Sequence, residues 1–252
     1  MSMRGLPGAM LLASGALVGA AAMMVHLGQT LDLGKFGLGS GRQSVVVVMS
    51  RDGGLIFGGD DDARTRTSSS LANRGLSQVQ LAKFRGSDRQ WSRLVRCVRD
   101  RYAQYDVQIV EQPPAVGDYV LAMVGGPPRQ LELEKTVGGL APHNGSVISD
   151  AVVFVFQTRG SKVSELCQTT AHEIGHTLGL DHTRLCSDIM SYERCGPKRF
   201  RDQHARCGEW SDRDCDVGDS HQNSEQLIAQ AVGYRRDPDR TPRRRPLALA
   251  RR

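Results

Sequence analysis

The segment from His172 to His182 constrains the fold more than any other part of the chain. It reads His-Glu-Ile-Gly-His-Thr-Leu-Gly-Leu-Asp-His, with histidines at 172, 176 and 182. On a helix, residues four apart project from one face about one turn apart, so His172 and His176 can share a metal ion. The third histidine joins them if the helix ends near Gly179, where glycine permits a left-handed turn and the chain doubles back.

The residue types in this segment indicate a catalytic zinc site. Three neutral imidazoles leave one position of tetrahedral Zn²⁺ open for water, as catalytic sites do and structural sites do not. Glu173 follows the first ligand and can reach that water without taking a coordination position. A bare His-Glu-x-x-His pair can arise by chance, whereas the longer pattern rarely does. We therefore predict His172, His176 and His182 as the metal ligands and Glu173 as the general base.

Hydrophobic patterning predicts three helices. Ser87 and Gln90 form a capping box that opens the first of them. The helix that carries the motif is expected from about Lys162 to Leu178, with Ser161 as its cap. The last helix is expected from Asn223 to Val232, with Asn223 as its cap and Gly233 as its stop.

Short apolar runs between these helices predict strands, which gives an α/β or α+β arrangement. Residues 50–75 hold paired glycines, three consecutive aspartates and three consecutive serines, and we interpret them as a long loop. The acidic triplet 60–62 could bind Ca²⁺, but a solvated loop is the favoured reading. The expected strands are 45–49, 106–111, 119–124 and 151–156, with a short extended piece at 138–141.

The two ends of the chain differ in composition from its middle. Residues 1–25 predict a signal peptide, or alternatively an uncleaved N-terminal anchor, and 26–43 predict a glycine-rich linker. The catalytic domain is expected at 44–234. The tail at 235–252 contains eight Arg and two Asp, and 8 − 2 = +6 equals the net charge of the whole chain. Such a tail can touch anionic surfaces, but a solvated, disordered end is favoured and no specific nucleic-acid partner is expected.

The chain contains six cysteines, an even number that predicts disulfides in an exported protein. Fifteen connectivities are possible, and the sequence does not choose among them. No Cys-x-x-Cys pair occurs, which argues against a zinc site made of cysteines. These features together predict a secreted or extracytoplasmic protein, and we expect a monomer.

The zinc signature at 172–182, followed by Asp-Ile-Met-Ser-Tyr at 188–192, resembles that of the metzincin clan of zinc metalloproteases. The resemblance implies an α+β fold, with a twisted, mostly parallel sheet and two long helices in an N-terminal subdomain. A smaller, irregular, cysteine-rich subdomain that ends in a helix would follow. It also implies that Met190 forms the floor beneath the metal and that Tyr192 lies near the zinc, as in astacin- and serralysin-like members. The subfamily stays open among astacin-, serralysin- and matrixin-like types.

By the same resemblance, the chain would be an endopeptidase whose substrate lies extended along Gly139, Leu140 and Ala141. Two other functions stay open. One is a non-catalytic, zinc-binding secreted or adhesion protein, against which Glu173 argues because a structural zinc site needs no such carboxylate. The other is a zinc hydrolase that acts on a substrate other than a peptide.

Overall fold

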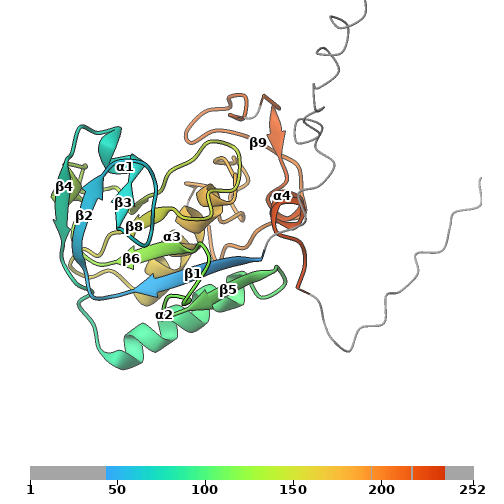
Figure 1. The fold of residues 1–252 in the computed structure, drawn as a ribbon. Helices are drawn as coiled ribbons and strands as arrows, with labels where there is room; N and C mark the ends of the chain where they lie inside the picture. Colours follow the sequence, from blue (N-terminus) through green and yellow to red (C-terminus); the bar gives the residue numbers. More distant parts are fainter. Residues whose placement is uncertain (1–43, 194, 217, 236–252) are drawn as a thin grey trace, which may run out of the picture. The chain divides into compact units, whose positions relative to one another are not determined.

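The computed structural model describes residues 44–193, 195–216 and 218–235 (Figure 1). The signal or anchor segment predicted at 1–25, the linker at 26–43 and the predicted tail beyond Arg235 lie outside the described residues. Within the described ranges, no helix is both long and apolar enough to cross a lipid bilayer.

A five-stranded sheet forms the centre of the described fold, in the order β5-β1-β6-β8-β7 (Figure 1). The pairs β5–β1, β1–β6 and β6–β8 are parallel, whereas the edge strand β7 runs antiparallel to β8. The predicted α+β class with a mostly parallel sheet is therefore confirmed. The strands are β1 (Val45–Ser50), β5 (Val107–Val110), β6 (Val120–Val124), β7 (Gly139–Leu140) and β8 (Val152–Val155).

Three main helices follow the predicted boundaries closely: α2 (Asp88–Arg101), α3 (Val163–Thr177) and α4 (Ser224–Ala231). The capping box that opens α2 is present, and the Asn223 side chain caps α4 by accepting the Gln226 N–H. The prediction that Ser161 caps the motif helix was wrong by one residue, because Lys162 holds that position. The Ser161 hydroxyl instead accepts the Thr158 N–H at 3.0 Å and closes the turn before the helix.

The continuous apolar runs of the strands reflect a sheet that is covered on both faces. In β6, Val120, Ala122 and Val124 pack with the buried residues of α2 and α3. Leu121 and Met123 point the other way and belong to a second buried cluster. Each face of the sheet therefore has its own hydrophobic core, and α3 packs on the face that Val120, Ala122 and Val124 line.

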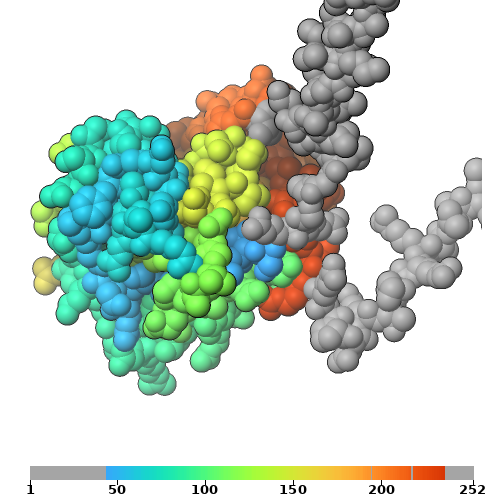
Figure 2. All heavy atoms as spheres, viewed as in Figure 1, coloured from blue at the N-terminus to red at the C-terminus, as the bar shows by residue number. Residues whose placement is uncertain are grey.

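The prediction of a long loop at 50–75 was wrong, because this region forms strands and a short helix that pack on the second face of the sheet. It holds β2 (Gly54–Gly58), β3 (Thr67–Ser68) and α1 (Ser69–Ala72), and β4 (Gln78–Leu81) follows just beyond it. The three strands form a small sheet in the order β3-β2-β4. In Figure 2 their blue-to-teal atoms form the left part of the viewed face.

The acidic triplet in this region is used by turns, so calcium stays unsupported. Asp61 accepts hydrogen bonds from the backbone N–H and the hydroxyl of Ser69, at 3.0 and 2.5 Å. Asp62 accepts from the backbone N–H groups of Arg64 and Thr65. Both carboxylates stabilise local backbone geometry.

All six cysteines are paired, as Cys97–Cys167, Cys186–Cys195 and Cys207–Cys215. The first pair joins α2 to α3 across 70 residues of sequence, and the other two close loops of the C-terminal segment. The predicted disulfides are present. The connectivity that the sequence left open is sequential, because each cysteine pairs with its neighbour along the chain.

We expect mass spectrometry under non-reducing conditions to find no alkylatable thiol in the mature protein. Removing the first disulfide with Cys97→Ser/Cys167→Ser should lower the free energy of unfolding by about 4 kcal/mol, because it closes the longest loop. The Cys186–Cys195 disulfide closes a shorter loop, of sequence separation 9. Its removal with Cys186→Ser/Cys195→Ser should lower the free energy of unfolding by about 3 kcal/mol by the same relation. Urea unfolding of both variants measures the difference, and six alkylatable thiols in the parent would contradict the pairing.

Candidate metal centre

The end of α3 brings the third histidine back towards the first two. Gly179 adopts a left-handed conformation with φ of +88° just after the helix. A Cβ at this position would also lie 3.0 Å from the carbonyl oxygen of Gly145, so both backbone and space favour glycine. The Leu180 N–H then bonds to the Gly175 carbonyl at 3.1 Å, which closes the turn and returns His182 to the helix.

The three predicted ligands meet at one point. The Nε2 atoms of His172, His176 and His182 lie 3.1 Å from one another in all three pairs. Ligand atoms at about 2.0–2.1 Å from a common zinc ion in tetrahedral geometry are separated by about this distance. His172 and His176 are buried, so water does not separate the rings.

The protonation of these rings also suits a metal. Each Nδ1 faces an oxygen acceptor, so each Nδ1 carries the hydrogen and each Nε2 keeps its lone pair. Burial lowers the pKa of His172 to about 3 and holds the pKa of His176 well below its usual value, which keeps both rings neutral. Three Nε2 lone pairs that face one another repel unless a cation lies between them. The three histidines therefore fit a zinc ion. The Nδ1 acceptors of His172, His176 and His182 are Ile189 O at 2.9 Å, Leu180 O at 2.8 Å and Glu209 Oε1 at 2.7 Å.

Glu173 is buried beside this point, and burial raises the pKa of its carboxyl to about 8. A bound cation would favour the ionised form instead. Gly139 of the edge strand lies directly against it, since a Cβ on Gly139 would come within 2.5 Å of Glu173 Cγ. A cavity of about 240 Å³ is lined by Glu173, Gly139, Leu140 and Ala141 together with His176 and His182. The predicted base and the predicted substrate strand therefore share one cavity with the ligands.

Met190 packs against the helix that carries the motif, and Tyr192 packs against the ligand rings. Met190 is fully buried, and its sulfur comes so close to Gly175 that a Cβ there would lie 2.7 Å from it. The Tyr192 ring centroid lies 4.4 Å from that of His182, and the side chain is 43% exposed. Burial raises the pKa of the Tyr192 phenol to about 12, and the nearby Glu173 adds to this. The phenol therefore keeps its proton and can donate a hydrogen bond.

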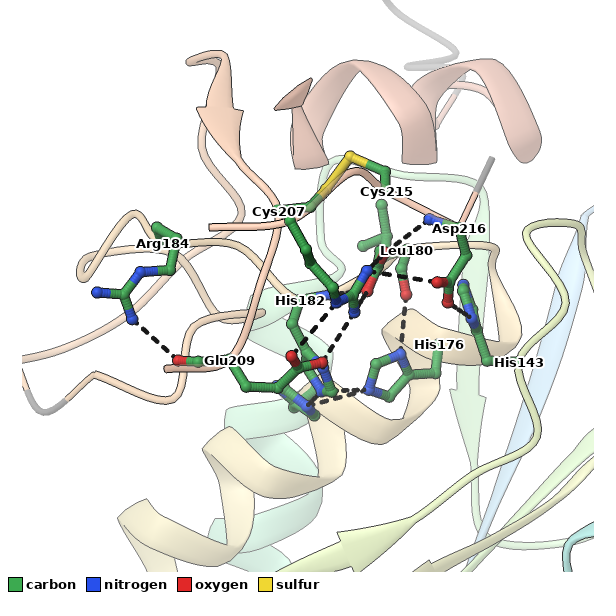
Figure 3. A network of polar contacts seen from close by, with 12 residues as sticks. His143, His176, Leu180, His182, Arg184, Cys207, Glu209, Cys215 and Asp216 are labelled. Carbon is green, nitrogen blue, oxygen red and sulfur yellow. Dashed lines mark hydrogen bonds and ion pairs between the residues drawn. A yellow bond between two sulfur atoms is a disulfide. The ribbon is translucent and has the colours of Figure 1, made fainter. Parts of the chain in front are cut away.

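Several residues around the site were missed by sequence reasoning. Glu209 contacts His182, and Trp210 beside it is 77% exposed and lies 5.6 Å from the Tyr192 ring. His143 lies 5.5 Å from the His176 ring and pairs with Asp216 at 3.1 Å (Figure 3). No spacing rule links these residues to the motif, and only the cysteines that flank Glu209 mark the region in the sequence.

A second group of possible metal ligands is already occupied by a guanidinium. Asp181, His182 and Glu209 have ligand atoms within 4.8 Å of one another. Arg213 Nη2 lies between the two carboxylates, 2.6 Å from Asp181 and 2.8 Å from Glu209. Its hydrogen bonds lower the pKa of Glu209 to about 2, so both charges of the ion pair are present at neutral pH. Cys207 and Cys215, which form a third such group with Asp181, are joined in a disulfide, so within the described ranges the three histidines are the group left free for a metal.

Comparison with known families agrees with this geometry. A family model described as Matrixin matches residues 87–203, from the cap of α2 past Tyr192. No curated protein matches the chain. Matrixins bind a catalytic zinc, and the family implies a zinc metalloendopeptidase. The matrixin match supports a metzincin-type zinc metalloprotease, the resemblance that residues 172–192 carry in the sequence.

Proposed function

We propose that the protein is a secreted, zinc-dependent endopeptidase in which Glu173 is the general base. The observation that carries this proposal is the convergence of three imidazole lone pairs at 3.1 Å beside a buried carboxylate. A zinc ion held by His172, His176 and His182 would supply a Lewis acid that polarises the scissile carbonyl and makes water more acidic.

Glu173 supplies proton transfer in this proposal. It projects from α3 next to the first ligand and lines the cavity, so its carboxylate can take a proton from water. It then passes the proton to the leaving amine. Tyr192, which keeps its phenolic proton, would donate a hydrogen bond to the oxyanion.

The edge strand β7 supports a peptide as the substrate. It is the last strand of the five-stranded sheet and pairs with β8 only, through Gly139–Val155 and Leu140–Phe154. An extended peptide can add to the free edge of such a strand through backbone hydrogen bonds. In this proposal the scissile bond would lie beside Glu173, because a Cβ on Gly139 would come within 2.5 Å of that side chain.

Export is supported by the oxidised cysteines and by the family match, which together suggest an extracellular location. We propose that the apolar segment within 1–25 directs secretion. The Arg-rich tail takes no part in the proposed chemistry.

The test is the metal content and proteolytic activity of the full chain. Elemental analysis should find about one zinc per chain in the parent and none in the His172→Ala/His176→Ala/His182→Ala variant. Casein or fluorogenic-peptide cleavage should stop on adding a zinc chelator and return when zinc is restored. Full zinc occupancy in the triple variant would refute the ligand assignment. A zinc-loaded parent without hydrolytic activity would favour the non-catalytic alternative.

A further inference from the structure

The third ligand differs from the other two in what its Nδ1 contacts. His172 and His176 each bond to a backbone carbonyl, whereas His182 bonds to the Glu209 carboxylate at 2.7 Å (Figure 3). Building on the proposed zinc site, we propose that Glu209 is a positioning residue that fixes the His182 ring and sets the affinity of the site for zinc. A carboxylate behind a ligating histidine fixes its tautomer and increases its basicity.

The carboxylate is itself held in place by a closed ring of polar contacts. Arg213 donates to Glu209 from Nη2 at 2.8 Å and from Nε at 3.3 Å. The same guanidinium donates to both oxygens of Asp181, at 2.6 and 2.7 Å. Asp181 is 3% exposed and accepts the backbone N–H of His182 at 2.6 Å. The contacts thus run from the His182 ring through Glu209, Arg213 and Asp181 back to the His182 backbone.

The backbone of the surrounding loop is tied to the same histidine. The disulfide Cys207–Cys215 closes this loop, and the Gly208 N–H donates to the His182 carbonyl at 3.1 Å. Gly208 has a φ of +134°, and a Cβ there would overlap the Ser211 carbonyl oxygen. Because the loop is fastened directly before Glu209, its carboxylate has little freedom to leave His182.

Glu209, Arg213 and the loop that carries them lie outside the region that the matrixin model matches. The match ends at residue 203, whereas the loop spans 207–215. The family match therefore accounts for the three ligands but not for Glu209 or Arg213.

The experiment compares Glu209→Gln with the full-length parent. Glutamine keeps the shape and one acceptor oxygen but removes the charge, so the loop should still fold. Zinc affinity is measured by competition with a chromophoric chelator, and we expect it to fall about 10–100-fold. Co²⁺ is then bound in place of zinc, and its visible spectrum should change because the His182 ring is no longer held in one orientation.

Asp212→Asn is the matched control, because Asp212 lies in the same loop and pairs only at the surface with Arg184 and Arg206, at 3.6 and 3.9 Å. It should bind zinc and Co²⁺ as the parent does, and the zinc-free forms of all three proteins should be folded at the temperature of the assay, as measured by circular dichroism. Zinc affinity of Glu209→Gln within threefold of the parent would overturn the proposal, as would an equal loss in Asp212→Asn. A parent that binds no zinc would instead refute the zinc site itself, so the two failures are distinguishable.

Discussion

Glu173→Gln is expected to lower kcat/KM for peptide cleavage by at least about 10²–10⁴-fold while zinc stays bound. The carboxylate lies beside the ligands but is not one of the three groups that converge at 3.1 Å. Without it, water near the metal has no positioned proton acceptor and the leaving amine has no donor. The double role places the loss at or above the range for a single proton transfer.

Zinc stoichiometry and fluorogenic-peptide cleavage should be measured on the same preparations of both proteins. Glu165→Gln is the matched control, since Glu165 lies on the same helix, is exposed, and accepts the Lys162 N–H through its side chain. It should cleave like the parent. If Glu173→Gln cleaves within tenfold of the parent, Glu173 is not the base. If zinc disappears together with activity, Glu173 is a ligand or a structural support.

The parts of the fold that the sequence predicted are those governed by local rules. A helix that must present His172 and His176 on one face and then release the chain at Gly179 is fixed by periodicity and by glycine geometry, and the structure follows it. The apolar runs of the central strands are equally readable because both of their faces are buried.

The region at 50–75 was misread because its strands are short and only partly buried. In β2 only Ile56 is buried, while Leu55 and Phe57 are 37% and 42% exposed, so no alternation of apolar and polar residues marks the strand. Its stability comes from pairing with β3 and β4 and from packing on the central sheet. Tertiary contacts of this kind leave little trace in a single sequence.

Glu209 could not be found for a different reason. It lies 27 residues from His182, and the contact depends on how an irregular loop is folded by a disulfide. The sequence left the pairing of Cys207 open, so it could not bring Glu209 to the metal centre. Outer contacts of a metal site follow from tertiary structure, whereas the ligands on one helix follow from spacing.

Gly139→Ala should reduce kcat/KM by about 10²-fold, although alanine adds only one methyl group. That methyl would lie 2.5 Å from Glu173 Cγ and 2.6 Å from Oε1, closer than carbon atoms can approach. Either the edge strand or the general base must therefore move. A displacement of about 1 Å at a catalytic group can cost about this much in rate. Zinc should stay bound, because the three heavy atoms nearest to the new methyl group all belong to Glu173 and none belongs to an imidazole.

Gly138→Ala provides the matched control, because it makes the same change one residue earlier on the same segment. A Cβ there meets only the Thr169 side chain, at an ordinary 3.4 Å, and points away from Glu173 as strand alternation requires. Steady-state cleavage and zinc content of both variants separate the two positions. Equal activity of the two variants would show that Gly139 does not set the position of Glu173. A loss in Gly139→Ala alone, with zinc retained, would show that the edge strand and the general base are in direct contact during catalysis. Both substitutions add one methyl group to the same segment, but only the methyl group at residue 139 meets Glu173.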